Sequence, residues 1–415
     1  MADEMEREDP RERRSPEERE AALMKSLPAL VSHVFATAPG YRRRDPSVVP
    51  EEVTDREALA KLTLVRKSEL PELQRADPPF GGLSVIAAPQ AAKLFSSPGP
   101  VFELEPRTVD PWRASRALRA AGFRPGDVVH NSFSYHLTPA GSMIETAAHA
   151  LGCAVIPGGT APTEAQAIAA AQFRATAYGG TPSFLKILLD RAAELKLDLT
   201  ALTRASVTAE ALPAALRKGL AERGVEVLQW YGTADAGLIA YETPALEGLV
   251  LDEDVILEIV RPGTGDPVPA GEVGEVVVTV LSADHPLLRF ATGDLSAILP
   301  GQSACGRTNV RIRGWMGRAD QSTKVRGLFV HPSHVAELVR RHPEVGRARI
   351  VVTRRDDLDQ MVVRAEVRPE ERTGLREALG KTVRDLTQLR GDVELVELRS
   401  LPNDGKVIDD QRPVG

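Results

Sequence analysis

The sequence predicts an α/β protein with a large N-terminal domain and a small, mobile C-terminal α+β domain. In the middle of the chain, short valine-rich runs alternate with helical patterns and are joined by short connections. This alternation is typical of a parallel sheet flanked by helices. From about residue 250 the pattern becomes β-rich and indicates an antiparallel subdomain. After Gly317, helical and strand patterns return and predict a separate α+β unit.

The expected strands and helices of the alternating region follow one another in the order that a parallel sheet requires. Its expected strands are residues 127–132, 153–157, 175–178, 204–207 and 225–230. Its expected helices are residues 112–122, 141–151, 163–173, 181–195 and 212–223. Ligands of such sheets bind outside the carboxyl ends of the strands. The residues that follow position 230 therefore lie where a site is expected.

The later elements define the rest of the N-terminal domain and the C-terminal unit. Residues 255–260 and 271–281 are rich in valine and predict strands of the β-rich subdomain. In the C-terminal unit, helices are expected at 332–340 and 374–389, and strands at 347–353, 360–367 and 392–398. The expected domains are residues 21–317 and 318–415.

The N-terminal segment has a different character. Residues 1–20 are dense in charges of both signs and lack an apolar face, so they are expected to form a flexible tail. Residues 21–36 have the apolar spacing of a helix, which Pro28 is expected to break.

Composition excludes several classes of function. The formal net charge of -6 argues against a general nucleic-acid-binding surface. No apolar run approaches the length of a membrane span. The two cysteines, Cys153 and Cys305, are far apart, which favours a reducing cytoplasm and predicts neither a disulfide framework nor a structural zinc site.

The functional signal comes from blocks that are weak when taken alone. They are residues 231–235 (YGTAD), 289–294 (RFATGD), 317–320 (GRAD), 324–334 (KVRGLFVHPSH) and a glycine–lysine pair at 405–406. Their order and spacing resemble the phenylacetate–CoA ligase family of adenylate-forming acyl-CoA synthetases. The resemblance covers residues 25–410, almost the whole chain. It implies that ATP activates a carboxylic acid as an acyl-adenylate and that coenzyme A then accepts the acyl group.

The resemblance also implies a nucleotide site. Its expected members are Ser96, Ser97, Gly99, Ala209, Glu210, Tyr231, Gly232, Thr233, Ala234, Asp294 and Arg318. The ring of Tyr231 is expected to cover adenine. Asp294 is expected to accept hydrogen bonds from the ribose hydroxyls, and Arg318 to contact the ribose.

Two residues are expected to act on the reacting groups. Asp235 resembles the family's metal-binding acid, and a hard cation such as Mg²⁺ prefers carboxylate oxygens. Lys406 corresponds to the family's mobile lysine, which stabilises charge on the acyl carboxylate and the α-phosphate during adenylation. Both are therefore candidate catalytic residues.

The phosphate loop departs most from the family pattern. Where the family has T-S-G-T-T-G-K-P, this chain has FSSPGP at residues 95–100. Proline has no backbone N–H to offer a phosphate oxygen. ATP is therefore held with fewer donors, or cations elsewhere neutralise its phosphates, and Lys93 and Arg107 are candidates for that role.

The resemblance further implies an acid pocket and a hinge. The pocket residues are expected to be Phe133, Tyr135, His136, Gly158, Gly159 and Thr160. Aromatic and small residues suit a flat, apolar acid of the kind used in aromatic acid catabolism. Asp320 is expected to be the hinge of a domain rotation, and Arg326 and Gly327 to meet the coenzyme A channel. The family resemblance also implies a homodimer.

Two alternatives stay open. In one, the acyl group passes to a carrier protein instead of coenzyme A. In the other, the chain is a non-catalytic relative that binds a nucleotide or an acyl-CoA. The proline-containing phosphate loop, Ala234 in place of a hydroxyl residue, and the short loop after Lys406 favour the second alternative. The joint presence of Tyr231, Asp235, Asp294, Arg318 and Lys406 favours the enzyme.

Overall fold

A computed structural model describes residues 9–97, 101–319, 321–325, 328–355, 358–369 and 373–412. The chain divides into two compact units. The first comprises residues 1–257, 278–290 and 299–315, and the second comprises residues 258–277, 291–298 and 316–415. The second unit thus contains two segments that precede the expected domain boundary at 317/318. Gly99, Asp320, Arg326 and Gly327 lie outside the described residues.

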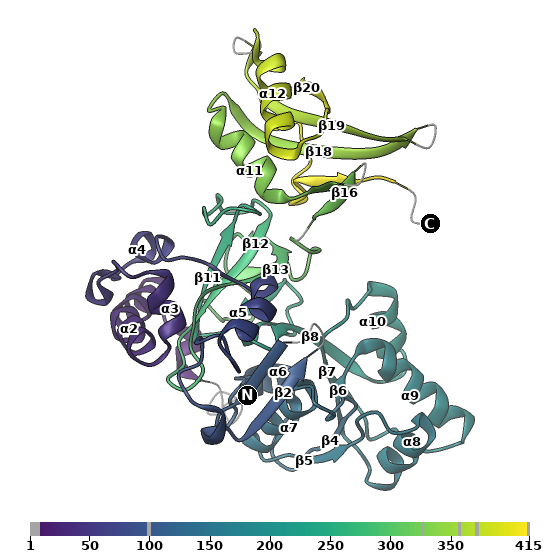
Figure 1. Ribbon diagram of the computed structural model, residues 1–415. Coiled ribbons are helices and arrows are strands. Elements are labelled where there is room, and N and C mark those ends of the chain that lie inside the picture. Colours follow the sequence, from purple (N-terminus) through teal and green to yellow (C-terminus); the bar gives the residue numbers. More distant parts are fainter. Residues whose placement is uncertain are drawn as a thin grey trace. The chain divides into compact units, whose positions relative to one another are not determined.

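The first unit is built on a nine-stranded sheet (Figure 1). In sheet order its strands are β14 (Ile298–Leu299), β15 (Arg311–Ile312), β10 (Leu249–Leu251), β9 (Gly237–Glu242), β8 (Glu226–Thr233), β7 (Arg204–Val207), β6 (Ala177–Gly180), β4 (Val128–Asn131) and β5 (Ala154–Pro157). Strands β5, β4, β6, β7 and β8 are parallel. The β8–β9, β9–β10 and β10–β15 pairs are antiparallel. The parallel part matches the expected strands to within two or three residues.

Helices cover both faces of this parallel sheet. They are α6 (Ser115–Ala120), α7 (Ala140–Ala150), α8 (Thr163–Gln172), α9 (Pro182–Glu194) and α10 (Ala214–Ala221). Neighbouring residues of β6 point into different cores: Ala177 packs with the residues of α6 and α7, and Tyr178 packs with those of α8 and α9. This alternation follows from the two-residue period of a strand. Both faces of the parallel sheet are therefore buried under helices.

The N-terminal segment corrects a prediction. Instead of a flexible tail, residues 10–20 form the 3-10 helix η1 (Pro10–Arg13) and the start of helix α2 (Pro16–Thr37). A reciprocal capping box between Ser15 and Glu18 begins α2. The Arg19 side chain is buried and pairs with the buried Glu253. Arg19 of this charged segment therefore pairs with an acid that is distant in the sequence, and local composition does not reveal such a pairing.

Pro28 also lies inside α2 without ending it, contrary to the prediction. A proline inside a helix costs about 3 kcal/mol because one hydrogen bond is lost. The helix buries Leu23, Leu27, Val31 and Val34 almost completely. Burying one such side chain contributes roughly 1.5–3 kcal/mol, so this face outweighs the cost of the proline.

Shorter elements complete the N-terminal part and the β-rich region. The helices are α3 (Pro39–Arg44), η2 (Pro50–Glu52), α4 (Arg56–Ala60), η3 (Lys67–Glu69), α5 (Leu70–Ala76) and η4 (Ala88–Gln90). A hairpin consists of β2 (Lys93–Ser97) and β3 (Val101–Glu105). A four-stranded sheet has the order β1 (Val65–Arg66), β13 (Leu287–Ser296), β12 (Gly274–Val280) and β11 (Val255–Val260). The β-rich prediction is thus confirmed.

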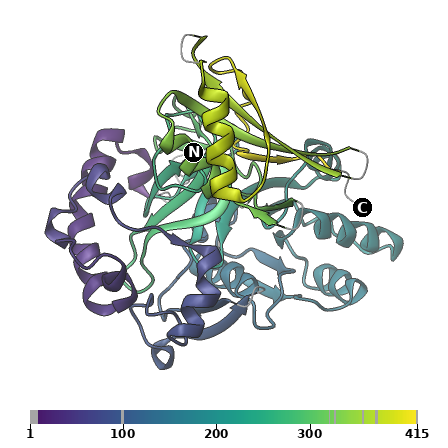
Figure 2. The same ribbon diagram turned by 45° about the horizontal axis from the view of Figure 1, so that its top comes forward.

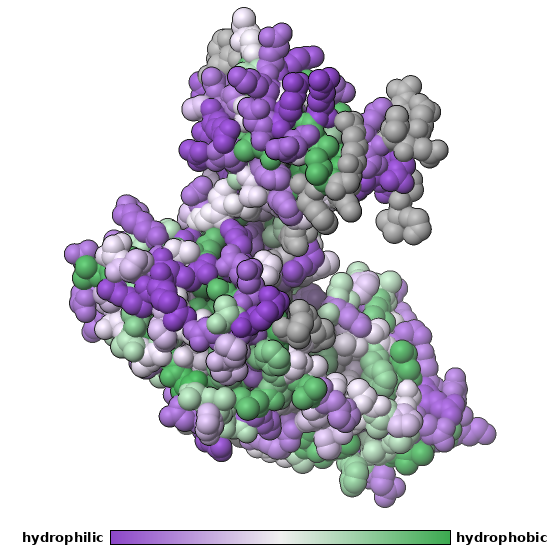
Figure 3. Space-filling view, in the orientation of Figure 1, coloured by the Kyte–Doolittle hydropathy of each residue, from purple (hydrophilic) through white to green (hydrophobic). Residues whose placement is uncertain are grey.

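The C-terminal part of the second unit is a small α+β fold, as expected. Its sheet has the order β20 (Asp392–Val396), β19 (Leu358–Val367), β18 (Val345–Arg355) and β21 (Ile408–Asp410), and β16 (Thr323–Val325) pairs with β17 (Leu328–Val330). Helices α11 (Pro332–Arg341) and α12 (Leu375–Thr387) share one buried core with this sheet. Figure 2 shows the yellow helix α12 against the strands. The face drawn in Figure 3 is mainly hydrophilic over this part.

No helix within the described ranges is long and apolar enough to cross a membrane.

Candidate active site

The adenine-site residues of the first unit gather at one edge of the parallel sheet. Tyr231, Gly232 and Thr233 end strand β8, and Tyr231 is largely buried. The hydroxyl of Thr208, which follows β7, donates a hydrogen bond of 2.7 Å to the carbonyl of Trp230. This bond ties the turn of Ala209 and Glu210 to the end of β8. The sheet thus brings the residues expected around adenine together at the carboxyl ends of two neighbouring strands, where ligands of parallel sheets bind.

Asp235 follows this turn and has a cation beside it. Lys67 Nζ, from η3, lies 2.6 Å from Asp235 Oδ2. The Asp235 side chain is 5% exposed and that of Lys67 is 30% exposed, so solvent reaches the pair mainly at the lysine. Among the described residues, no three His, Cys, Asp or Glu side chains gather as a metal site. A single carboxylate still suits Mg²⁺ in a site where phosphate oxygens and waters complete its coordination.

A second acid lies in the same pocket. Glu103, in β3, is buried, and burial together with the nearby Asp235 raises the pKa of its carboxyl to about 7. Ser97 donates a hydrogen bond of 3.0 Å to Glu103 Oε1. Glu103 and Asp235 line a pocket of about 60 Å³ whose aromatic lining residues are Tyr41, Phe80, Phe102 and Phe290. Lys67, which pairs with Asp235, is the neighbouring cation that offsets part of this negative charge.

The described part of the expected phosphate loop, residues 95–97, lies in strand β2. Ser96 pairs with Phe102 of β3, and its N–H donates to the carbonyl of Leu137. The Ser97 hydroxyl is engaged by Glu103, as described above. Of the two candidate cations, Lys93 already has partners: its ammonium contacts the hydroxyl of Ser142 at 2.6 Å and Glu105 at 3.3 Å. Arg107 is exposed.

The expected acid-pocket residues also come together. The β-carbon that a side chain at Gly159 would add lies 3.5 Å from the ring of Tyr135 and 3.8 Å from the carbonyl of Phe133. The ring of His136 lies 3.4 Å from the hydroxyl of Thr160. The phenol of Tyr135 accepts a hydrogen bond of 2.7 Å from Asn131. Gly159 therefore lies close to the ring of Tyr135.

In the second unit, Asp294 and Arg318, the two residues expected at the ribose, pair with each other. Arg318 donates to Asp294 Oδ1 at 2.8 Å, and the two residues also form a backbone bridge. Gly293 has a φ of +77°, and a β-carbon there would lie 2.8 Å from the Arg318 guanidinium. A side chain at position 293 would therefore displace the arginine. Arg289, in contrast, is buried and bonds to the carbonyls of Ala60 and Leu62, which is a structural role in the first unit.

Lys406 lies in the same unit as Asp294 and Arg318. Arg318 and Lys406 line one cavity, together with the acids Asp404, Asp409 and Asp410. The ammonium of Lys406 pairs with Asp409 at 2.9 Å, and its side chain is about half exposed. Exposed pairs of this kind contribute about 0–1 kcal/mol, so little free energy holds the lysine in this position.

Reasoning from the sequence missed Lys67, Glu103 and Gln321. Lys67 is 168 residues from Asp235, and no local pattern relates them. Glu103 resembles an ordinary strand residue in the sequence. Gln321 directly follows the expected hinge residue, and that position is the one signal that could have drawn attention to it.

Two families of AMP-binding enzymes match the chain. The AMP-binding enzyme family matches residues 113–280, and the AMP-binding enzyme C-terminal domain matches residues 327–412. The phenylacetate–coenzyme A ligase of Thermus thermophilus is 32% identical over 371 residues, which span 85% of this chain and 82% of that protein. This chain belongs to the phenylacetate–CoA ligase family. As a member, it is an adenylate-forming acid–CoA ligase.

Other comparisons agree with this membership. The Escherichia coli phenylacetate–coenzyme A ligase is 29% identical over 96% of this chain and 95% of that protein. The ligase of Aromatoleum evansii is 29% identical over 90% of this chain and 88% of that protein. Among solved structures, a 2-hydroxyisobutyryl-CoA ligase in an open conformation superposes with a TM-score of 0.71 at 24% identity, covering 94% of this chain and 91% of that one. This likeness shows that this chain and the solved protein share a fold.

Proposed function

We propose that this member of the phenylacetate–CoA ligase family joins an aromatic, phenylacetate-like acid to coenzyme A. In the first step, a carboxylate oxygen of the acid attacks the α-phosphorus of ATP and pyrophosphate leaves, which forms the acyl-adenylate. In the second step, the thiol of coenzyme A attacks the acyl carbon and AMP leaves. The relatives named above carry the name of this reaction.

Each of the described site residues has a separate role in this adenylation proposal. Tyr231 covers adenine, while Asp294 and Arg318 bind the ribose. Lys406 stabilises the negative charge that develops between the carboxylate and the α-phosphate. Mg²⁺, when bound at Asp235, would neutralise phosphate charge, and Lys67 would add a second positive charge beside the same carboxylate.

One observation carries the adenylation proposal. Arg318, paired with Asp294, lines the same cavity as Lys406. A ribose-binding pair and a mobile cation are the groups that an acyl-adenylate requires near one another. The preference for an aromatic acid is supported separately by the aromatic and small residues Phe133, Tyr135 and Gly159, which lie close together, because such residues suit a flat, apolar acid.

The test is AMP formation from ATP, Mg²⁺ and coenzyme A with a panel of aryl and short-chain acids, with acid-dependent pyrophosphate exchange measured in parallel. AMP formation that depends on phenylacetate or a close analogue supports the proposal. AMP formation with short-chain acids alone refutes the aromatic preference. Exchange without a thioester product points to a carrier protein as the acceptor.

A second candidate function rests on a specific observation. Glu103 places a buried carboxyl beside Asp235, and its ionised form would repel phosphate groups. This repulsion favours a second function, in which the protein binds a nucleotide or an acyl-CoA and catalyses no reaction. Absence of both AMP formation and exchange in a folded protein, with nucleotide binding retained in calorimetry, would support that candidate. The homodimer and the cytoplasmic location stay predictions.

A further inference from the structure

The turn that carries Lys406 is ordered in its backbone, although the lysine side chain is half exposed. The Lys406 N–H donates to Asp404 Oδ1 at 3.0 Å, which closes a local turn. Gly405, with a φ of +71°, precedes the lysine. A β-carbon at Gly405 would lie 2.6 Å from Val273 and 3.1 Å from Leu295, so the turn packs tightly at this point. The backbone of the lysine is thus fixed, while its ammonium is held only by the half-exposed pair with Asp409.

Gln321 holds this turn on both sides of the lysine. Its carboxamide nitrogen donates to the carbonyl of Gly405 at 2.9 Å. Its carboxamide oxygen accepts from the N–H groups of Val407 at 2.6 Å and Ile408 at 2.9 Å. One side chain therefore makes three hydrogen bonds to the main chain that flanks Lys406. Because all three partners are backbone groups, these bonds define the position of the turn independently of its side chains.

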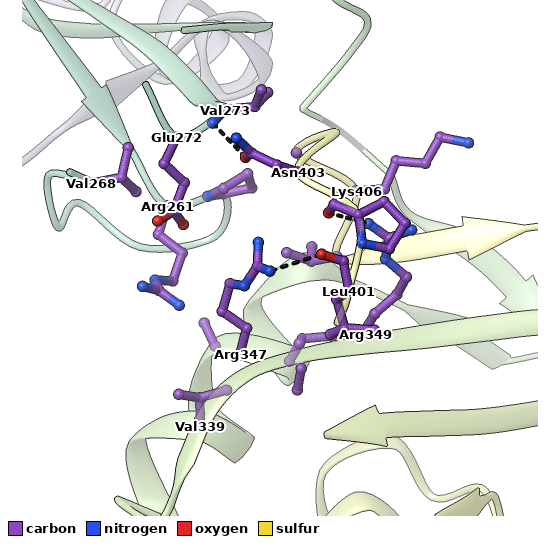
Figure 4. A pocket seen from close by; sticks show the side chains of 17 residues that line it. Arg261, Val268, Glu272, Val273, Val339, Arg347, Arg349, Leu401, Asn403 and Lys406 are labelled. Carbon is purple, nitrogen blue, oxygen red and sulfur yellow. Dashed lines mark hydrogen bonds between the residues drawn. The ribbon is translucent and has the colours of Figure 1, made fainter. Parts of the chain in front are cut away.

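Two further side chains, those of Asn403 and Arg349, hold the turn on the side before the lysine. Asn403 accepts from the Val273 N–H at 3.0 Å and donates to the carbonyl of Gly271 at 3.1 Å. Figure 4 shows the bond between Val273 and Asn403 at the pocket that Lys406 also lines. Arg349, in β18, is buried and pairs with Asp404. Gln321 differs from these anchors because it lies three residues from Arg318, which binds Asp294.

We propose that Gln321 is a positioning residue for adenylation, which fixes the main chain on both sides of Lys406 so that the ammonium reaches the reacting groups from a set position. This inference rests on the proposed function and deepens it. Gln321 bonds directly to the lysine turn, and Arg318, Gln321 and Lys406 line the same cavity. Misplacing a charged group by about 1 Å can cost roughly a hundredfold in rate. Gln321 would thus act through Lys406, without touching the substrate.

The experiment compares Gln321→Ala with the wild type in each half-reaction, with phenylacetate as the acid. Single-turnover formation of the acyl-adenylate measures the first step. Thioester formation from synthetic phenylacetyl-adenylate and coenzyme A measures the second. We expect the first rate constant to fall roughly ten- to a hundredfold. We expect the second to stay within roughly twofold, because Lys406 acts in adenylation.

The control variant is Gln360→Ala, which removes an exposed glutamine from strand β19 of the same unit. A second variant, Gln321→Glu, keeps the oxygen acceptors for Val407 and Ile408 and is expected to lose less of the first step than Gln321→Ala. Hydrogen exchange of the Val407 and Ile408 amides gives a readout that does not depend on turnover. Both amides are expected to exchange faster in Gln321→Ala and at the wild-type rate in Gln360→Ala.

The outcomes separate the inference from the function on which it rests. Wild-type adenylation in Gln321→Ala overturns the inference and leaves the proposed function intact. An equal fall in both half-reactions also overturns it, because Gln321 would then only support the fold. A wild-type protein that forms no acyl-adenylate from any acid overturns the proposed function itself, and the inference with it.

Discussion

Lys67 Nζ lies 2.6 Å from Asp235 Oδ2, so the carboxylate expected to bind Mg²⁺ already has a cation at one of its oxygens. The two residues are 168 positions apart in the chain. The lysine reaches the acid from η3, and the acid follows strand β8. This pair places a positive charge beside the expected phosphate site, in a chain whose short phosphate loop contains no lysine.

Replacing Lys67 by methionine tests whether this charge serves ATP. Methionine keeps the apolar stem and removes the ammonium, so the phosphates and Asp235 lose a compensating charge. We expect kcat/KM for ATP to fall roughly tenfold or more, which corresponds to about 1.4 kcal/mol. The measurement is steady-state AMP formation at varied ATP. Lys61→Met is the matched control, because Lys61 is exposed and pairs only locally with Glu57. Unchanged kinetics in Lys67→Met would contradict the prediction.

Glu103 predicts a dependence of stability on pH. Its folded-state pKa of about 7 lies above the ordinary value of 4.5. Between these two values the folded state binds more protons than the unfolded state, so the stability that this group contributes is lost as pH rises towards 7. Glu103→Gln removes the ionisation and is expected to raise the unfolding free energy by roughly 2 kcal/mol at pH 8, with little effect near pH 4.5.

Urea unfolding of both proteins at pH 5 and pH 8 measures this effect. Glu51→Gln, at an exposed position, is the control and should leave the pH dependence unchanged. The prediction is wrong if the stability difference between wild type and Glu103→Gln is the same at both pH values.

Replacing Lys406 by alanine tests the adenylation step. We expect acid-dependent pyrophosphate exchange to fall roughly a hundredfold or more, because a charge-stabilising donor in the transition state is lost. Thioester formation from preformed acyl-adenylate should stay near the wild-type rate. Lys381→Ala, in the exposed face of α12, is the control. Full pyrophosphate exchange activity in Lys406→Ala would show that this lysine is not a catalytic residue.

Arg19 tests the role of the N-terminal helices. Its guanidinium is buried against Glu253, whose side chain is 1% exposed, and it also donates to the hydroxyl of Thr308. Arg19→Met leaves the buried acid with Arg14 as its remaining cation and is expected to cost about 1–3 kcal/mol of unfolding free energy. The midpoint of urea unfolding measures the loss. Lys25→Met, on the exposed side of the same helix, should be nearly neutral, and an equal effect of both changes would contradict the assignment.

Much of the fold was predictable from local patterns. Strand β7 was expected at its observed residues, and helices α7 and α8 to within one residue at each end. These elements were predictable because a buried parallel strand and its covering helix each leave a periodic apolar pattern. The helical structure of residues 10–20 was not predictable, because Arg19 in this segment pairs with a residue 234 positions away.

The sequence by itself determined the α/β architecture, the family, and the strand-end position of Tyr231 and Asp235, since all of these follow from periodicity and from motif order. The tertiary structure alone decided which charges meet. Lys67 beside Asp235, Glu103 in the same pocket and Gln321 around the Lys406 turn are long-range pairings. Their formation depends on how separate elements pack, and side-chain packing between distant segments leaves no periodic trace in the chain.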